Sequence, residues 1–485
     1  MNKYLEKIAA EKKNEMRKHQ TDALAQLDQN DGILLHHSTG SGKTKTFLKA
    51  IEKSHLGDPT NQALIIAPAS LVTNIDKEIK KHKLKIDPSR LTAMSYEKAV
   101  NSVDTLRTKH FHTIVFDESH KLRNTDTKRN KYLREIAESA DKRILATATG
   151  VYNTPSDIAP LVNIAAGHKI LPEDKATFEK HFIESSMVDP GFINRVVLGV
   201  APGERRDLKN TRTLKKAFDR YVHHYDSKDD PSMVDHFPTT SEKIVPVQMS
   251  KGQTQVYNFL EGQIPIHIRM KIHNGLPLNK KESANLNAFS MGVRQASNST
   301  RPYIKEGAEY EPSQKILKAV DSLHKRFKTD KNFKGLVYSN FLNAGVNDYS
   351  EELTKRGIPH HVLTGSLSKV EKDAMVEDYN KGRKPVLVIS SSGGEGLDLK
   401  GTKLTQIIEP HWNAAKIAQV KGRGARFDSH IDLPKAERHV DVEHYLSVFP
   451  EHWLWGKQNK KSIDEYMFHN SGVKDDLTQQ MKELM

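Results

Sequence analysis

The sequence of 485 residues contains no cysteine. This absence excludes disulfide bonds, thiolate metal sites and a cysteine nucleophile, and it suits folding in a reducing compartment. No stretch approaches the roughly 18 apolar residues of a membrane span, and residues 1–18 are too charged for the apolar core of a signal peptide. We therefore expect no membrane partner and a cytoplasmic location, in a bacterium or a host cell, with the nucleus as an open alternative.

Positive charge is in excess, because 75 Lys and Arg residues outnumber 61 Asp and Glu residues and give a net charge of +14 at pH 7. Such a balance favours a polyanionic partner, with nucleic acid first and an anionic membrane surface a distant second. Part of the excess lies in 204–220, where seven Lys or Arg residues stand against three acids. This run predicts either a solvated helix face or direct contacts with phosphate groups.

Short apolar runs, each followed by a polar or glycine-containing loop, recur in two series. The first series lies between residues 31 and 163, and the second begins near Lys334. Such runs are typical of buried parallel strands with ligand-binding loops at their carboxyl ends. We therefore predict an α/β fold class with two parallel-sheet domains, a helical insertion and a helical C-terminal brace. The predicted boundaries are 1–165 and 313–450 for the two sheet domains, 166–312 for the helical insertion and linker, and 451–485 for the C-terminal helical segment with Trp453 and Trp455.

A glycine-rich segment, 37–44, follows an apolar strand and precedes a helical stretch, which is the setting of a phosphate-binding loop. Gly40 and Gly42 allow backbone N–H groups to point at phosphates, Lys43 supplies a cation, and Thr44 offers a hydroxyl to Mg²⁺. His37 stands where the strict pattern has its first glycine, and an ordinary glycine-rich turn is the alternative reading. The predicted nucleotide contacts of the loop are Thr39, Gly40, Ser41, Gly42, Lys43 and Thr44.

An acidic pair, Asp117 and Glu118, follows the strand predicted over 112–116. A carboxylate at a strand end can hold Mg²⁺ through water while the next one polarises the attacking water. We therefore predict that Asp117 is the metal residue and that Glu118 is the general base. A surface acidic turn is the alternative, but it would not explain why the pair follows a phosphate-binding loop and a strand.

Two further motifs carry hydroxyl and guanidinium groups. The next strand closes on Thr147–Gly150, where Thr149 is expected to contact nucleic acid and a helix N-cap is the competing role. Arg423 and Arg426 are three residues apart, which predicts one shared helix face that reaches a γ-phosphate held by the other domain. The alternative for this arginine pair is a basic helix that lies on DNA.

The histidine doublets, such as His36–His37 and His223–His224, invite a metal hypothesis. Adjacent residues on a strand point to opposite faces, and no cysteine is present to complete a site. We therefore expect surface or packing histidines, and Mg²⁺ bound with the nucleotide as the one metal.

Together these motifs resemble those of superfamily 2 helicase-type ATPases over nearly the whole chain. The resemblance implies two RecA-like domains that bind ATP and Mg²⁺ and act on nucleic acid. Residues 17–20 are similar to the adenine-reading segment, with Gln20 as the base-recognising residue, and 393–399 are similar to motif V, with Gly396 and Asp398 at the nucleotide. The residues expected to contact nucleic acid are Pro68, Ser70, Ser95, Thr149, Ser339, Thr364, Gly365, Gly394 and Trp412.

Three features resemble the SWI/SNF-type branch: DESHKLRN at 117–124, KIVPVQMSKGQTQVY at 243–257, and the long insertion. The segment GRGARF at 422–427 departs from that branch and is closer to the helicase-type ATPases of poxviruses and other large DNA viruses. This departure implies a minimal motor of phage or viral origin rather than a chromatin remodeller.

The resemblance therefore implies a DNA-dependent ATPase that translocates on duplex or branched DNA and remodels the DNA or its protein complexes. A strand-separating helicase of replication, recombination or repair, which would favour single-stranded DNA, is the first alternative. The second alternative is the ATPase subunit of a transcription, packaging or restriction assembly, which would act with a protein partner.

Overall fold

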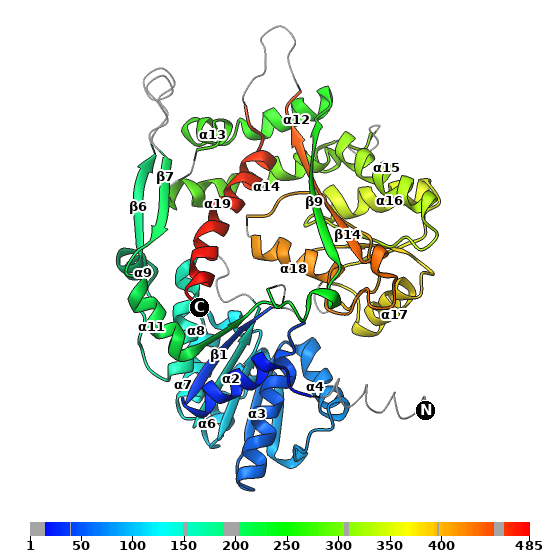
Figure 1. The fold of residues 1–485 in the computed structure, drawn as a ribbon. Helices are drawn as coiled ribbons and strands as arrows, with labels where there is room; N and C mark the ends of the chain where they lie inside the picture. The colour runs from blue at the N-terminus through cyan, green and yellow to red at the C-terminus, as the bar shows by residue number, and fades with distance from the viewer. Residues whose placement is uncertain are drawn as a thin grey trace. The chain divides into compact units, whose positions relative to one another are not determined.

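The computed structural model describes residues 15–38, 40–148, 154–188, 203–227, 229–276, 278, 280–304, 310–394, 397–412, 414–450 and 460–485. The chain divides into two compact units, which Figure 1 shows as ribbons. The first unit comprises Met1–Glu184, Asp207–Val234 and Leu477–Met485, and the second comprises Ser185–Arg206 and Asp235–Asp476.

The first unit is built on a parallel sheet with the strand order β3-β2-β4-β5-β1-β8. The strands are β1 (Gly32–His37), β2 (Ala63–Ala67), β3 (Leu91–Ser95), β4 (Thr113–Asp117), β5 (Lys142–Thr147) and β8 (Val222–Tyr225). Side chains alternate between the two faces, so that Leu34 of β1 joins one buried core cluster while Ile33 and Leu35 join the other. Because all strands are parallel, the residues that follow β1 and β4 lie at the same edge of the sheet.

Helices cover both faces of this sheet. One face packs on α2 (Lys18–Asp28), α3 (Lys43–Gly57) and α4 (Ala69–Lys81). The other face packs on α5 (Tyr96–Asn101), α6 (Val103–Arg107), α7 (Lys128–Glu138), α8 (Ile158–Ala166), α9 (Lys175–Phe182) and α11 (Thr211–Tyr221). A separate two-stranded sheet is formed by β6 (Ile183–Val188) and β7 (Gly203–Leu208).

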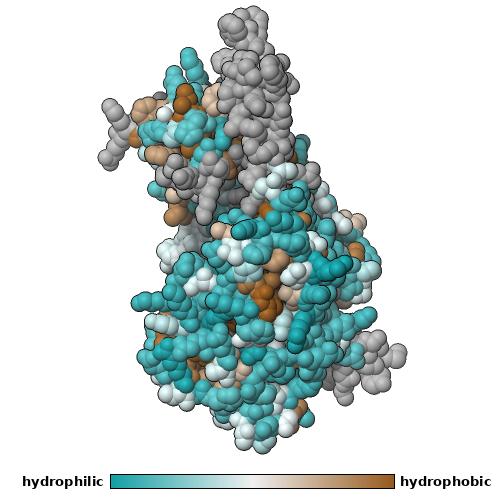
Figure 2. All heavy atoms as spheres, turned by 90° about the vertical axis from the view of Figure 1, so that its left-hand side faces the viewer, coloured by the Kyte–Doolittle hydropathy of each residue, from teal (hydrophilic) through white to brown (hydrophobic). Residues whose placement is uncertain are grey.

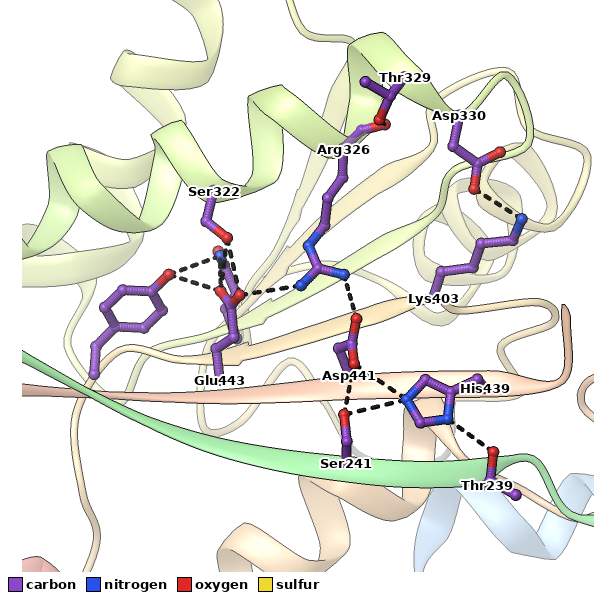
Figure 3. Close-up of polar contacts among 12 residues, drawn as sticks. Thr239, Ser241, Ser322, Arg326, Thr329, Asp330, Lys403, His439, Asp441 and Glu443 are labelled. Carbon is purple, nitrogen blue, oxygen red and sulfur yellow. Dashed lines mark hydrogen bonds and ion pairs between the residues drawn. The ribbon is translucent and has the colours of Figure 1, made fainter.

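The second unit is built on another parallel sheet, with the strand order β11-β12-β10-β13-β14-β9. Its strands are β9 (Thr239–Gln248), β10 (Gly335–Tyr338), β11 (His360–Leu363), β12 (Val386–Ile389), β13 (Leu404–Ile407) and β14 (His439–Val448). The helices of this unit that follow its strands are α15 (Gln314–Thr329), α16 (Asn347–Lys355), α17 (Lys369–Asn380) and α18 (Ala414–Gly424). Figure 3 shows how polar side chains tie α15 to this sheet: Arg326 bonds Asp441 and Glu443 of β14, and the Asp441 carboxylate also accepts from Ser241 of β9.

A helical cluster completes the second unit. It consists of α12 (Lys251–Glu261), α13 (Ile266–His273), α14 (Lys280–Asn298) and the first part of α19 (Ile463–Glu483), which share one buried apolar core. The Lys315 ammonium of α15 lies 2.7 Å from the Asp464 carboxylate of α19, and both side chains are 1% exposed. This buried ion pair joins the helical cluster to the sheet.

The predicted α/β fold class with two parallel-sheet domains is confirmed by this architecture. The segment 166–312, which the sequence predicts as a helical insertion and linker, also supplies β8 to the first sheet and β9 to the second. Within the described part of the chain, none of the helices combines the length and the apolar composition that a membrane crossing requires.

Candidate functional site

The loop between β1 and α3 has the backbone shape of a phosphate-binding loop. Gly40 and Gly42 have φ angles of +84° and +86°, a region that side chains other than glycine rarely adopt. A Cβ atom on Gly42 would lie 2.5 Å from the Gln20 Nε2 atom. The loop therefore requires glycine at position 42, and it ends on the N-terminus of a 15-residue helix, where backbone N–H groups favour an anion.

Lys43 is the first residue of α3, and its ammonium folds back over the loop. Lys43 Nζ donates hydrogen bonds to the carbonyl oxygens of His37 at 2.8 Å and Ser38 at 3.1 Å. Thr44 follows in the first helical turn, and Ser41 is fully buried. A cation held at this point can transfer to phosphate oxygens without a large movement of the backbone.

The acidic pair lies at the same sheet edge. Asp117 ends β4 and is buried, and Glu118 adopts a φ angle of +53°, which is uncommon for a residue with a side chain. Burial and the neighbouring Glu118 carboxylate raise the pKa of Asp117 to about 7, and the Lys43 ammonium opposes this shift. Because β1 and β4 run parallel in one sheet, the phosphate-binding loop and the acidic pair lie at the same edge.

The acidic pair is also linked to the end of β5. The His120 Nδ1 atom lies 3.2 Å from the Glu118 Oε2 atom and 3.3 Å from the Thr147 hydroxyl. His120 therefore bridges Thr147 and the candidate general base Glu118. Its neighbour Thr149, which the sequence singles out for nucleic-acid contact, lies outside the described residues, as do Thr39 and Gly396.

The oxygen atoms at this edge suit Mg²⁺. A carboxylate at Asp117 and a hydroxyl at Thr44 are the hard donors that this ion prefers. Because the buried Asp117 carboxylate has a raised pKa, a nearby cation would favour its charged form. The residues present therefore fit a magnesium–nucleotide complex, with Asp117 and Thr44 as the groups that would hold the metal.

The segment before the loop braces it from α2. Gln20 Nε2 donates to the carbonyl oxygens of Ser41 at 3.3 Å and Gly42 at 3.2 Å, while its Oε1 accepts from Arg17 N. The His19 Nε2 atom lies 2.9 Å from Ser41 O. The family resemblance gives Gln20 a base-reading role; in this structure both ends of its amide contact the protein backbone.

The strand β8 also contacts the phosphate-binding loop, and sequence reasoning missed it. His36 and His37 point to opposite faces of β1, as expected, and each meets a histidine of β8 at 2.9 Å, His224 and His223 respectively. The signal was present in the sequence as two histidine doublets and a histidine in place of the first loop glycine. Pairing the doublets with each other would have found the strand.

In the second unit, the arginine pair differs from the prediction. The helix α18 ends at Gly424, so Arg423 lies in its last turn and Arg426 lies beyond its end. The expectation that the two arginines share one helix face is therefore wrong, because the chain leaves the helix at Gly424, whose missing side chain lets it approach Thr405. Arg426 Nη1 donates to Leu397 O at 3.2 Å and lies 3.7 Å from the carboxylate of Asp398.

The predicted nucleic-acid contacts of the first unit gather at one edge of its sheet. Pro68 and Ser70 follow β2, and Ser95 ends the neighbouring strand β3. Ser70 is exposed, whereas the Ser95 hydroxyl caps α5 by accepting from Lys98 N at 3.1 Å.

In the second unit, the loops after β11 and β12 approach each other closely. A Cβ atom on Gly393 would lie 2.0 Å from Leu363 O, and one on Gly365 would lie 2.5 Å from Ser392 Oγ. Thr364, Gly365 and Gly394 are thus brought to one sheet edge.

Two other residues of the second unit that are predicted to contact nucleic acid form contacts within the unit itself. Ser339 is 1% exposed, and its hydroxyl lies 3.0 Å from the buried Glu409 carboxylate. Trp412 is half-buried and packs edge-on against Tyr466. The Ser339 hydroxyl therefore stabilises the packing below the sheet edge rather than forming part of its surface.

The basic run 204–220 begins in β7, and its larger part forms α11 in the first unit. Leu214, Phe218 and Tyr221 pack into the core, which leaves the opposite face in solvent. Figure 2 shows the side of the molecule that carries α9 and α11 in Figure 1, and its described surface is predominantly hydrophilic. The exposed basic residues of α11 are Arg212, Lys215, Lys216 and Arg220.

The geometry of the first unit is that of a nucleotide-binding α/β domain with a phosphate-binding loop and an acidic pair. Family models agree with this class: residues 13–151 match "Type III restriction enzyme, res subunit", 87–301 match "SNF2-related domain", and 315–428 match "Helicase conserved C-terminal domain".

Curated relatives extend the match over the whole chain. A protein of Acanthamoeba polyphaga mimivirus named "Putative ATP-dependent RNA helicase" is 31% identical, over 94% of this chain and 98% of the relative. A "Termination factor NPH-I homolog" of African swine fever virus is 24% identical, over 95% of this chain and 76% of the relative. The chain belongs to the family of helicase-type ATPases with SNF2-related and helicase C-terminal domains.

Among solved structures, the chain is similar to the "SWI2/SNF2 ATPase core in complex with dsDNA" of Sulfolobus solfataricus. The sequence identity is 16%, the TM-score is 0.38, and 97% of each chain is covered. It is also similar to the Hef helicase domain of Pyrococcus furiosus, with 16% identity, a TM-score of 0.49, and coverage of 89% of this chain and 95% of that chain.

Proposed function

We propose that this chain is an ATP-driven motor that translocates on DNA and remodels duplex or branched DNA, or protein–DNA complexes. The observation that carries the proposal is geometric: Lys43 begins the helix that follows β1, and the buried Asp117 ends β4, so both lie at the same edge of one parallel sheet. ATP and Mg²⁺ are the expected cofactors, and membership of a helicase-type ATPase family supports them.

In the proposed reaction, the loop 38–42 and Lys43 bind and orient the phosphates of ATP. Glu118 takes the role of general base toward the attacking water, and its contact with His120 orients its carboxylate. The Mg²⁺ ion supplies charge neutralisation of the phosphates. Arg423 and Arg426 are the proposed γ-phosphate partners, and Asp398, which pairs with Arg426, is the proposed nucleotide contact of motif V.

Nucleic acid as the partner is supported by the net charge of +14 and by the exposed basic face of α11. Because most contacts would be made to the phosphate backbone, binding should be largely independent of sequence and strongly dependent on salt. The loops after β2 and β3, and those after β11 and β12, are the proposed nucleic-acid surfaces of the two sheets.

A second candidate is an RNA-directed or transcription-associated ATPase. The specific observation in its favour is that two relatives, matched over 94% and 95% of this chain, carry the names of an RNA helicase and of a termination factor homolog. The two candidates share the same ATP site and differ in the nucleic acid that stimulates hydrolysis.

The test is steady-state ATP hydrolysis with no nucleic acid, single-stranded DNA, duplex DNA, branched DNA and RNA at one salt concentration. Stimulation by duplex or branched DNA is the expected result, stimulation by single-stranded DNA indicates a strand-separating helicase, and stimulation by RNA supports the second candidate. The variant Lys43→Ala should abolish hydrolysis and keep most nucleic-acid binding. Lys53→Ala, on the exposed face of the same helix, is the matched control and should leave hydrolysis intact. Full hydrolysis in Lys43→Ala would refute the assigned site.

A further inference from the structure

The strand β8 and the two residues after it form hydrogen bonds with the first residues of the phosphate-binding loop. The Ser38 hydroxyl lies 2.7 Å from the Ser227 hydroxyl and accepts a hydrogen bond from Ser227 N at 2.9 Å. Ser38 N donates to Tyr225 O at 2.9 Å. Ser227 is 1% exposed and Ser38 is half-buried, so these bonds are partly shielded from water.

The same strand supports the loop at two more points. His37, the last residue of β1, is 0% exposed, and its Nε2 atom lies 2.9 Å from His223 Nδ1. Tyr225 stacks on the His19 ring at 3.5 Å between centroids, and His19 in turn contacts Ser41 O. Contacts that originate in β8 therefore reach the loop at residues 37, 38 and 41.

This support coincides with the departure from the strict loop pattern. A glycine at position 37 would have no side chain to meet β8, whereas His37 fixes the loop start by a side-chain bond to a strand that enters from 185 residues later in the chain. The carbonyl oxygens of His37 and Ser38 are also the acceptors of the Lys43 ammonium. Hence whatever holds His37 and Ser38 also sets the position of Lys43.

We propose that Ser227 is a positioning residue of the ATP site: through its two hydrogen bonds to Ser38, it holds the phosphate-binding loop and Lys43 in the shape that binds the phosphates of the nucleotide. This inference rests on the proposed ATPase function and adds a residue that lies outside every motif of the loop. It assigns the support to residues 222–227, which lie in the Asp207–Val234 part of the first unit.

The proposal separates phosphate binding from binding of the rest of the nucleotide. In the full chain carrying Ser227→Ala, the affinity for ADP and ATP should fall about fivefold to tenfold, as expected for loss of the hydrogen bond between the Ser227 and Ser38 hydroxyls. The affinity for adenosine, which has no phosphate, should stay unchanged, and so should the kcat of hydrolysis once ATP saturates. A KM effect without a kcat effect is the signature of lost uniform binding.

The experiment measures equilibrium binding of ADP and of adenosine, by competition against a fluorescent ADP, to the wild-type chain and to three variants. Ser227→Ala removes only the bond between the two hydroxyls, whereas Ser38→Ala also removes the acceptor of the Ser227 backbone N–H. Both variants should weaken ADP alone, and the double variant should be no weaker than Ser38→Ala, because that variant already lacks both bonds. Ser232→Ala is the matched control, since Ser232 is exposed on the same segment and its hydroxyl donates to Asp230.

An unchanged ADP affinity in Ser227→Ala, an equal loss for ADP and adenosine, or additive losses in the double variant would each overturn the proposal. Thermal unfolding of each variant shows whether the chain is folded, and Ser38→Ala gives a second reading if Ser227→Ala is unstable. Because ADP binding is measured without turnover, these results remain decisive even if the wild-type chain hydrolyses no ATP, an outcome that would instead contradict the proposed function.

Discussion

Lowering the pH should lower the free energy of unfolding of the first unit, through the histidine pairs between β1 and β8. The His223 ring lies among His37 of β1, His224 of its own strand, and His19 and Asp22 of α2. Burial, followed by the neighbouring His19, lowers the pKa of His223 from 6.5 to about 4. The unfolded chain, in which this histidine is free, therefore takes up a proton at a higher pH than the folded unit.

The direction and the size of the change in the free energy of unfolding follow from this difference between the folded and unfolded pKa values. Since the folded-state pKa is the lower one, the stability associated with neutral His223 is fully present above pH 6.5 and is lost as the pH falls toward 4. Each pH unit inside this window costs about 1.4 kcal/mol, so that lowering the pH to 5 should remove about 2 kcal/mol. Burial also lowers the pKa values of His36 and His37, so these residues act in the same direction.

The assay is hydrogen exchange of peptides that cover β1 and β8 at pH 8, 6.5 and 5, corrected for the intrinsic pH dependence of exchange. The variant His223→Asn keeps a polar atom near the position of Nδ1 but cannot titrate. Its loss of protection between pH 8 and pH 5 should be smaller than the wild-type loss by about 2 kcal/mol. Peptides from β10 and β12, which contain no histidine, are the internal control. The same pH dependence in wild type and variant would refute the reasoning.

Three further predictions concern packing and charge. Lys315→Met leaves the buried Asp464 carboxylate without its counter-charge and should lower the free energy of unfolding by about 3–5 kcal/mol. Adding Asp464→Leu should restore part of this loss, because the Ser447 N–H also donates to that carboxylate. Chemical denaturation of the second unit measures both. Gly393→Ala should lower the melting temperature because its Cβ would meet Leu363 O at 2.0 Å, while Gly252→Ala in α12, with open space around it, should leave that temperature unchanged or raise it. Removal of three exposed charges of α11 should weaken binding to every nucleic-acid sequence and lower the slope of log affinity against log salt by up to about 3, measured by fluorescence anisotropy; an unchanged slope would mean that the face is only solvated. The three substitutions are Arg212→Ala, Lys215→Ala and Lys216→Ala.

Local patterns in the sequence were enough to predict the α/β fold class and the family. Continuous apolar runs indicate buried parallel strands because both faces of such a sheet are covered, and the glycines of the loop report backbone angles that only glycine adopts readily. Lys43 and Asp117 follow directly from these strands, since the carboxyl ends of parallel strands meet at one edge. The roles of the predicted site residues stay predictions that the experiments above test.

Only the tertiary structure decided which distant segments complete the two sheets. The strand β8 pairs with β1 across almost 190 residues, and β9 pairs with β14 across about 200, and such pairings leave no local periodicity in the sequence. The side-chain contacts made by these strands likewise could not be predicted from local sequence patterns. The histidines at 36 and 37 could be placed on opposite strand faces from the sequence, but their partners could not.

The end of α18 and the burial of Ser339 were likewise decided by packing. Spacing of three residues is compatible with one helix face, yet the helix stops at Gly424, where the chain passes close to Thr405. Ser339 is predicted to contact nucleic acid, yet it is 1% exposed and its hydroxyl donates to the carboxylate of Glu409, which lies 70 residues further along the chain. Sequence thus determined the strands and the chemistry of the loops at their ends, because both depend on neighbours along the chain, whereas the supports of those loops depend on neighbours in space.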